Sequence, residues 1–135
     1  MILDSSDGAD GGDLITAAAT GGIAHPTGYP LYLLLARLFQ FLPIGSLAFR
    51  TNLMSTVATV LGAALVYMIV TSSLLPSKPI QYWPAGLAAG YAFGLAPLIW
   101  SQAVITEVYA LQACLIALIL DLYIQPAQTS IPSQR

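Results

Sequence analysis

The feature that most constrains this chain is the near absence of charge over most of its length. Between Arg50 and Asp121, only Lys78 and Glu107 carry a charge. The chain is 57% hydrophobic and 7% charged, whereas soluble domains carry about 25% charged residues. This composition predicts an all-α fold, a multi-pass membrane helical bundle, and excludes a nucleic-acid-binding surface, which needs a basic face.

Three apolar stretches have the length of a transmembrane helix, which is about 20 residues. They cover about residues 50–73, 83–100 and 105–124. The second stretch has a tryptophan at each end, as is typical of the aromatic residues at membrane interfaces. Pro126 is expected to end the third, which leaves residues 125–135 as a polar tail.

A glycine recurs every four residues in the second stretch, at Gly86, Gly90 and Gly94. Small residues at this spacing lie on one face of a helix and let a second helix approach closely within a membrane. We interpret this ridge as a packing surface.

Residues 1–49 precede the first span and are expected to form a loop at the outer face with juxtamembrane helices. Residues 1–13 are polar and rich in glycine, which is typical of a loop. Asp13 is predicted to cap a helix over Leu14–Thr20. Gly21 and Gly22 are predicted to end this helix.

A second short helix is predicted over Leu31–Leu42. Pro26 favours an extended His25, and Pro30 suits the first turn of a helix. A helix of this length is about 18 Å long, too short to cross a bilayer of about 30 Å. Since it also carries Arg37, we expect it to lie in the membrane interface.

The topology follows from the number of spans and the placement of the cations. With three spans, residues 1–49 and the segment 101–107 lie on the same side of the membrane. The positive-inside rule places Lys78 and Arg135 on the cytoplasmic side. The outer or lumenal face then holds five polar side chains of interest: Asp10, Asp13, His25, Arg50 and Glu107.

Three carboxylates are candidate catalytic residues. Asp10 and Asp13 could act as a general base and its electrostatic partner, or they could be a loop aspartate and a helix cap. Glu107 lies at the mouth of a predicted span, where an ionisable side chain is costly and therefore suggests a function. Its alternative is a carboxylate stabilised by the helix dipole.

Two basic or titratable residues are candidate ligand contacts. Arg50 could bind a lipid-linked phosphate with its guanidinium, or it could extend to the headgroups. His25 could contact a phosphate or substrate, or satisfy a turn. A zinc site is not expected, because the chain has one histidine and its single cysteine, Cys114, lies in an apolar run.

These residues stand in motifs that resemble a known family. Asp10-Gly-Gly-Asp13 is similar to an acidic motif that opens the first outer loop of integral-membrane glycosyltransferases of the GT-C type. His25-Pro-Thr-Gly-Tyr-Pro30 matches a His-Pro-Pro-Gly-Tyr-Pro motif, with Thr27 in place of a proline. Residues 101–111 resemble a second signature. The nearest family is that of transmembrane proteins related to protein O-mannosyltransferases.

The resemblance implies roles for these residues within the N-terminal part of a GT-C fold. Asp10 would be the base that activates an acceptor hydroxyl. Asp13 and Glu107 would orient the acceptor or the donor phosphate, directly or through a divalent metal. No other cofactor is implied. Four residues would bind the donor: His25, Tyr29, Arg50 and Tyr109.

The resemblance also implies a reaction and a location. The enzyme would transfer a sugar, with mannose as a candidate, from a polyprenyl or dolichyl phosphate to a hydroxyl of a protein or glycan. The chain would lie in a bacterial inner membrane or an ER-type membrane, with its catalytic loop in the periplasm or lumen. Members of the family have a helix before the acidic motif and further spans, so we expect a fragment that is inactive alone.

Two further functions stay open from the sequence. One is a transporter-like helical bundle with Glu107 and His25 in a polar path. The other is a non-catalytic membrane anchor that uses the glycine ridge as a partner interface. A structure with the N-terminal loop far from Glu107 would favour either of these two functions.

Overall fold

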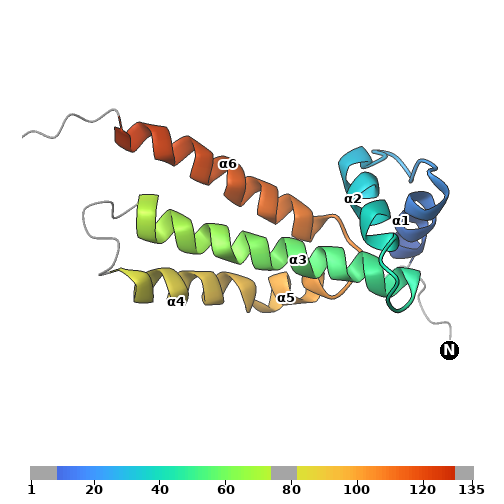
Figure 1. The fold of residues 1–135 in the computed structure, drawn as a ribbon, viewed down its shortest axis with the longest axis horizontal. Coiled ribbons are helices and arrows are strands. Elements are labelled where there is room, and N and C mark those ends of the chain that lie inside the picture. Colours follow the sequence, from blue (N-terminus) through green and yellow to red (C-terminus); the bar gives the residue numbers. More distant parts are fainter. Residues whose placement is uncertain (1–8, 74–81, 130–135) are drawn as a thin grey trace, which may run out of the picture. The chain divides into compact units, whose positions relative to one another are not determined.

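The computed structural model describes residues 9–73 and 82–129, which form helices and no strands. The elements are α1 (Ala9–Thr20), α2 (Pro30–Gln40), α3 (Leu47–Met68), the π-helical turn η2 (Ile69–Ser73), α4 (Trp83–Gly94), α5 (Pro97–Ala103) and α6 (Tyr109–Thr129), shown in Figure 1. The all-α prediction is confirmed for these residues. They divide into two compact units, one with the residues up to Ala58 and Ser101–Leu111, the other with Thr59–Trp100 and the residues from Gln112.

The first unit is built on the pairing of α1 and α2, which lie side by side (Figure 1). Leu14, Ala17 and Ala18 lie on one side of α1 and are buried. The two alanines let the helices approach closely because their side chains are small. The rest of this core is formed by residues of the loop, α2 and α3: Ala24, Tyr32, Ala36 and Met54.

Helix α1 ends as predicted but begins earlier. Gly21 has φ +72°, and the amide of Gly22 donates to the carbonyl of Ala17 at 3.0 Å, which is a glycine-terminated helix end. The helix begins at Ala9, so the predicted loop over residues 9–13 and the capping role of Asp13 are wrong. Tertiary packing outweighs the low helix propensity of the glycines here.

Helix α2 begins at Pro30 and ends at Gln40, which confirms the predicted element to within two residues. The turn before it is closed by the Gly28 amide, which donates to the His25 carbonyl at 2.9 Å. Tyr29 has the left-handed conformation with φ 41° at the helix N-cap.

The connection from α2 to α3 is held by the guanidinium of Arg50. It donates to the carbonyls of Ile44 at 2.6 Å, Gln40 at 2.7 Å and Gly45 at 3.0 Å. Three fixed bonds from one planar group give residues 41–46 a defined path.

Gln40 joins three helices of the first unit. Its amide donates to the Ile15 carbonyl of α1 at 3.2 Å and to the Thr51 hydroxyl of α3 at 3.1 Å. Both Gln40 and Thr51 are buried, so these bonds satisfy polar groups that would otherwise be costly to bury.

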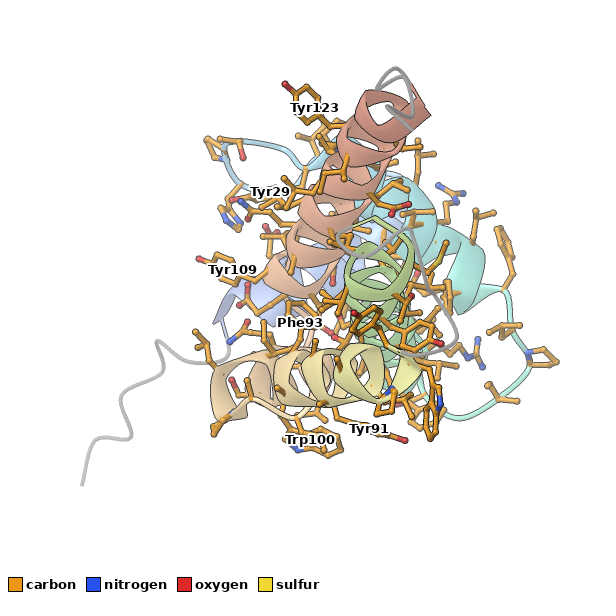
Figure 2. The ribbon with its side chains drawn as sticks, turned by 90° about the vertical axis from the view of Figure 1, so that its left-hand side faces the viewer. Tyr29, Tyr91, Phe93, Trp100, Tyr109 and Tyr123 are labelled. Carbon is orange, nitrogen blue, oxygen red and sulfur yellow. The ribbon has the colours of Figure 1, made fainter. Side chains whose placement is uncertain are left out.

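In the second unit, α4 packs on α3 and η2 through its glycines. A Cβ on Gly86 would lie 2.4 Å from a methyl of Thr71, and one on Gly90 would lie 3.0 Å from the Ala63 carbonyl. The interpretation of the glycine ridge as a packing surface is confirmed. Figure 2 shows Tyr91 and Trp100 projecting away from this packed side.

One helix of the described residues, Leu47–Thr71, is long and apolar enough to cross a membrane. This agrees with the first predicted span. The second, predicted as one helix over residues 83–100, is wrong: α4 ends at Gly94 and α5 begins at Pro97. A proline lacks the amide donor and disfavours helical dihedrals in the residue before it.

The third predicted span is helical but has different bounds. α6 runs from Tyr109 to Thr129, so the prediction that Pro126 ends it is wrong. A proline removes one backbone hydrogen bond, and the residues after it keep the helical path here. The strongly apolar part, Tyr109–Ile124, is shorter than a full span. The multi-pass topology therefore stays a prediction, and its cations Lys78 and Arg135 lie outside the described residues.

Candidate functional site

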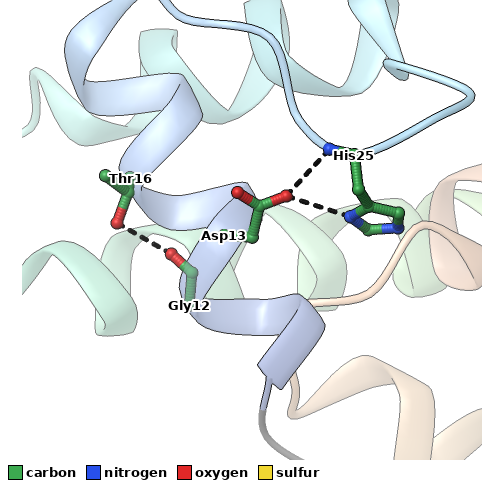
Figure 3. Close-up of polar contacts among 4 residues, drawn as sticks. All are labelled: Gly12, Asp13, Thr16 and His25. Carbon is green, nitrogen blue, oxygen red and sulfur yellow. Dashed lines mark hydrogen bonds and ion pairs between the residues drawn. The ribbon is translucent and has the colours of Figure 1, made fainter.

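The acidic motif and the histidine motif meet in a direct contact between Asp13 and His25. Oδ2 of Asp13 accepts a hydrogen bond from the His25 backbone amide and contacts Nδ1 of the imidazole, both at 2.9 Å (Figure 3). The two residues come from α1 and from the loop before α2. One carboxylate oxygen thus fixes both the main chain and the ring of His25.

This contact favours the ionised form of Asp13. The hydrogen bond from the His25 amide, with the ring contact as a second cause, lowers the pKa of the Asp13 carboxyl below its ordinary value of 3.8. A carboxylate with a lowered pKa stays ionised and is a weaker proton acceptor. The geometry therefore favours Asp13 as a group that orients His25.

Tyr29 lies against the imidazole of His25. The ring centroids are 5.8 Å apart with an interplanar angle of 69°, an edge-to-face arrangement. Its side chain, labelled in Figure 2, is half-buried. Asp13 and Tyr29 together fix the ring of His25 on two sides.

Asp10 lies in the first turn of α1. Residues three apart on a helix share a face, so the backbone places Asp10 on the same side of α1 as Asp13. Its side chain lies outside the described part of the structure.

The segment before Glu107 is attached to the same unit. The Thr106 hydroxyl donates to Oδ1 of Asn52 in α3, and a Cβ on Gly11 would lie 3.4 Å from the Thr106 carbonyl. Residue 106 thus lies against the beginning of α1. Glu107 follows directly and is half-buried.

Tyr32 adds a buried hydroxyl near Glu107. Burial is the main cause that raises the pKa of Tyr32 to about 12; a hydrogen bond with Ser55 opposes this rise, and the charge of Glu107 adds to it. The side chain is 3% exposed, so at neutral pH it is a neutral hydrogen-bond donor.

Arg50 and Tyr109, the other two predicted donor-binding residues, have different surroundings from His25 and Tyr29. The Arg50 guanidinium is bonded to three carbonyls of the α2–α3 connection. Tyr109 is 58% exposed at the start of α6 (Figure 2).

A metal site was tested against the described side chains. Among them, no group of three or more His, Cys, Asp or Glu residues lies close enough to hold an ion. Asp13 and His25 supply two ligand types, and their contacting atoms already bind each other.

No motif in the sequence singles out the polar residues that assemble this unit: Tyr32, Gln40, Asn52 and Thr106. Their position in the sequence could have indicated a structural role, since Gln40 and Asn52 flank the start of a long apolar stretch. Polar side chains at such positions are buried only with partners.

A family model described as the N-terminal domain of the protein O-mannosyl-transferase TMEM260 matches residues 10–134. The match begins at Asp10 and includes the acidic motif, the histidine motif and residues 101–111. The chain belongs to the TMEM260 N-terminal domain family.

Two relatives of the TMEM260 family have the same description. The protein O-mannosyl-transferase TMEM260 of Mus musculus is 33% identical over 132 residues, which are 97% of this chain and 18% of the relative. The protein of the same name from Dictyostelium discoideum is 30% identical over 125 residues, which are 87% of this chain and 14% of the relative. The chain thus spans less than a fifth of either relative. No solved structure matches it.

Proposed function

We propose that this chain is the N-terminal part of a membrane glycosyltransferase that transfers mannose to an acceptor hydroxyl. The observation that carries the proposal is the Asp13–His25 contact, which joins two motifs of a segment similar to protein O-mannosyl-transferases. The donor would be a polyprenyl or dolichyl phosphate carrying mannose, used at the periplasmic or lumenal face. The fold would be of the GT-C type, with further spans.

In this proposal, Asp10 takes the proton of the acceptor hydroxyl. The acceptor oxygen then forms a bond to the anomeric carbon of the sugar, and the bond from that carbon to the carrier phosphate breaks. General-base assistance of this kind contributes about 10²–10⁴-fold in rate. Asp13 is less suited to this step because its pKa is lowered.

His25 would contact the phosphate that leaves. Because Nδ1 faces Asp13, Nε2 is the ring nitrogen that would reach the donor. The imidazolium form of His25 would carry an N–H on both nitrogens, so that Nε2 donates a charge-assisted hydrogen bond that stabilises the negative charge developing on the phosphate. Asp13 would then act on the phosphate through His25, and Glu107 would orient the acceptor from the neighbouring segment.

The alternatives from the sequence receive less support. An N-terminal segment far from Glu107 would have favoured a transporter or an anchor. In the first unit, Gly11 packs against Thr106, the residue before Glu107. This proximity is the reason to prefer a shared site.

The experiment uses a full-length protein that contains this segment, reconstituted in lipid vesicles. Transfer of labelled mannose to an acceptor protein is measured with dolichyl phosphate mannose or with GDP-mannose as the donor. The proposal predicts transfer from the lipid-linked donor alone and a loss of at least about 100-fold in Asp10→Asn. Asp4→Asn is the matched control, with an unchanged rate expected. Transfer that survives Asp10→Asn would refute the role of Asp10, and use of GDP-mannose would refute the donor class.

A further inference from the structure

A groove of about 460 Å³ lies on the first unit, between the C-terminal half of α1, the loop after it and α2. Its walls are mainly apolar and include Ala17, Ala18, Leu33 and Leu34. Ile23 lines it and is 87% exposed. An apolar concavity of this size can hold part of a hydrocarbon chain.

The charge that lines this groove is positive. Arg37 is one of its lining residues, and the lining includes no carboxylate. The guanidinium shows no hydrogen bond or ion pair with any other described residue. Nη1 of Arg37 lies 2.5 Å from the point that a Cβ on Gly21 would occupy, so the absence of a side chain at residue 21 lets the guanidinium lie over the end of α1.

Helix α2, with its C-cap residue Phe41, carries an exposed apolar stripe. Leu31, Leu34, Leu38 and Phe41 follow the spacing of one helix face and are 50%, 64%, 62% and 73% exposed. Only residues 41–46 separate α2 from Leu47–Thr71, the helix that could cross a membrane. This short connection favours a position of the groove near a bilayer surface.

We propose that this groove binds one anionic glycerophospholipid, with its headgroup phosphate on Arg37 and an acyl chain along the apolar wall. A guanidinium matches a phosphate in charge and geometry. A cation beside the membrane favours anionic over zwitterionic lipid by about fivefold. The bound lipid would fix α1 and α2 at the membrane surface. This inference does not depend on the proposed glycosyl transfer.

The test counts lipids bound to the whole chain in neutral detergent micelles by native mass spectrometry. Phosphatidylglycerol and phosphatidylcholine with identical acyl chains are titrated separately. The site predicts about fivefold tighter binding of phosphatidylglycerol, lost in Arg37→Gln and kept in Arg135→Gln, which removes the same charge elsewhere. Leu34→Gln should weaken the binding of both lipids by the same factor. Helix content measured by circular dichroism identifies any variant that unfolds.

Several outcomes would overturn the proposal. Equal binding of the two lipids would exclude a phosphate site with anionic preference. An undiminished preference in a folded Arg37→Gln protein would place the lipid elsewhere. Displacement of phosphatidylglycerol by equimolar dolichyl phosphate would show that the groove holds the donor carrier. Release by free inorganic phosphate at the same concentration would show that the acyl chain contributes nothing.

Discussion

Replacing Arg50 by methionine should destabilise the first unit by about 2 kcal/mol. The guanidinium donates three hydrogen bonds to carbonyls of the α2–α3 connection. A hydrogen bond contributes about 0.5–1.5 kcal/mol net, and two of these bonds are exposed to solvent, so the lower half of that range applies. Arg50→Lys keeps the charge but loses the planar fork. It should cost about 1 kcal/mol, since a hydrogen bond or two is lost.

The assay is thermal unfolding in detergent micelles, followed by circular dichroism at 222 nm. Arg50→Met should lower the midpoint by about 6 °C and Arg50→Lys by about half as much. Arg37→Met is the matched control, because its guanidinium bonds no described residue, and its midpoint should stay within about 2 °C. An unchanged midpoint in Arg50→Met would refute the structural role and return Arg50 to the list of donor contacts.

Three further predictions rest on single positions. Gly86→Ala should destabilise the second unit by about 1–3 kcal/mol in the same unfolding assay, because the new methyl would overlap Thr71 and Tyr67; an unchanged midpoint would contradict the packing. Gly12→Ala should stabilise α1 by about 0.5–1 kcal/mol, since nothing lies within 4 Å of the added carbon; a lower midpoint would contradict this. The lowered pKa of Asp13 predicts stabilisation that is complete above its ordinary pKa of 3.8 and lost as the pH falls below it. Unfolding midpoints between pH 5 and pH 2 should therefore fall more steeply in the natural chain than in Asp13→Asn, and equal slopes would contradict the contact.

The sequence predicted which segments are helical better than it predicted where each helix begins and ends. Composition and apolar length are enough to predict helices, and proline and glycine chemistry correctly gave the end of α1 and the start of α2. The same rules failed for residues 9–13 and for Pro126, where the chain stays helical. Local propensity is a weak term that packing can outweigh.

The sequence pointed to both motifs but not to the contact that joins them. The motifs pointed to Asp13 as an electrostatic partner or a helix cap, and to His25 as a phosphate or substrate contact or a turn residue. Their mutual contact joins residues 12 apart, and no rule of spacing specifies it. Likewise, charge alone suggested a phosphate contact for Arg50, because the sequence does not show which carbonyls a folded connection presents.

The most direct test of the proposed site is a double-mutant cycle on mannosyl transfer by the full-length protein in vesicles. The rates of Asp13→Asn, His25→Gln and the double variant are compared with that of the natural protein. If Asp13 acts by holding His25, the double variant should lose no more activity than the His25 variant. Losses that multiply in the double variant would show that the two residues act independently, and activity that survives in all three would place the transfer site elsewhere.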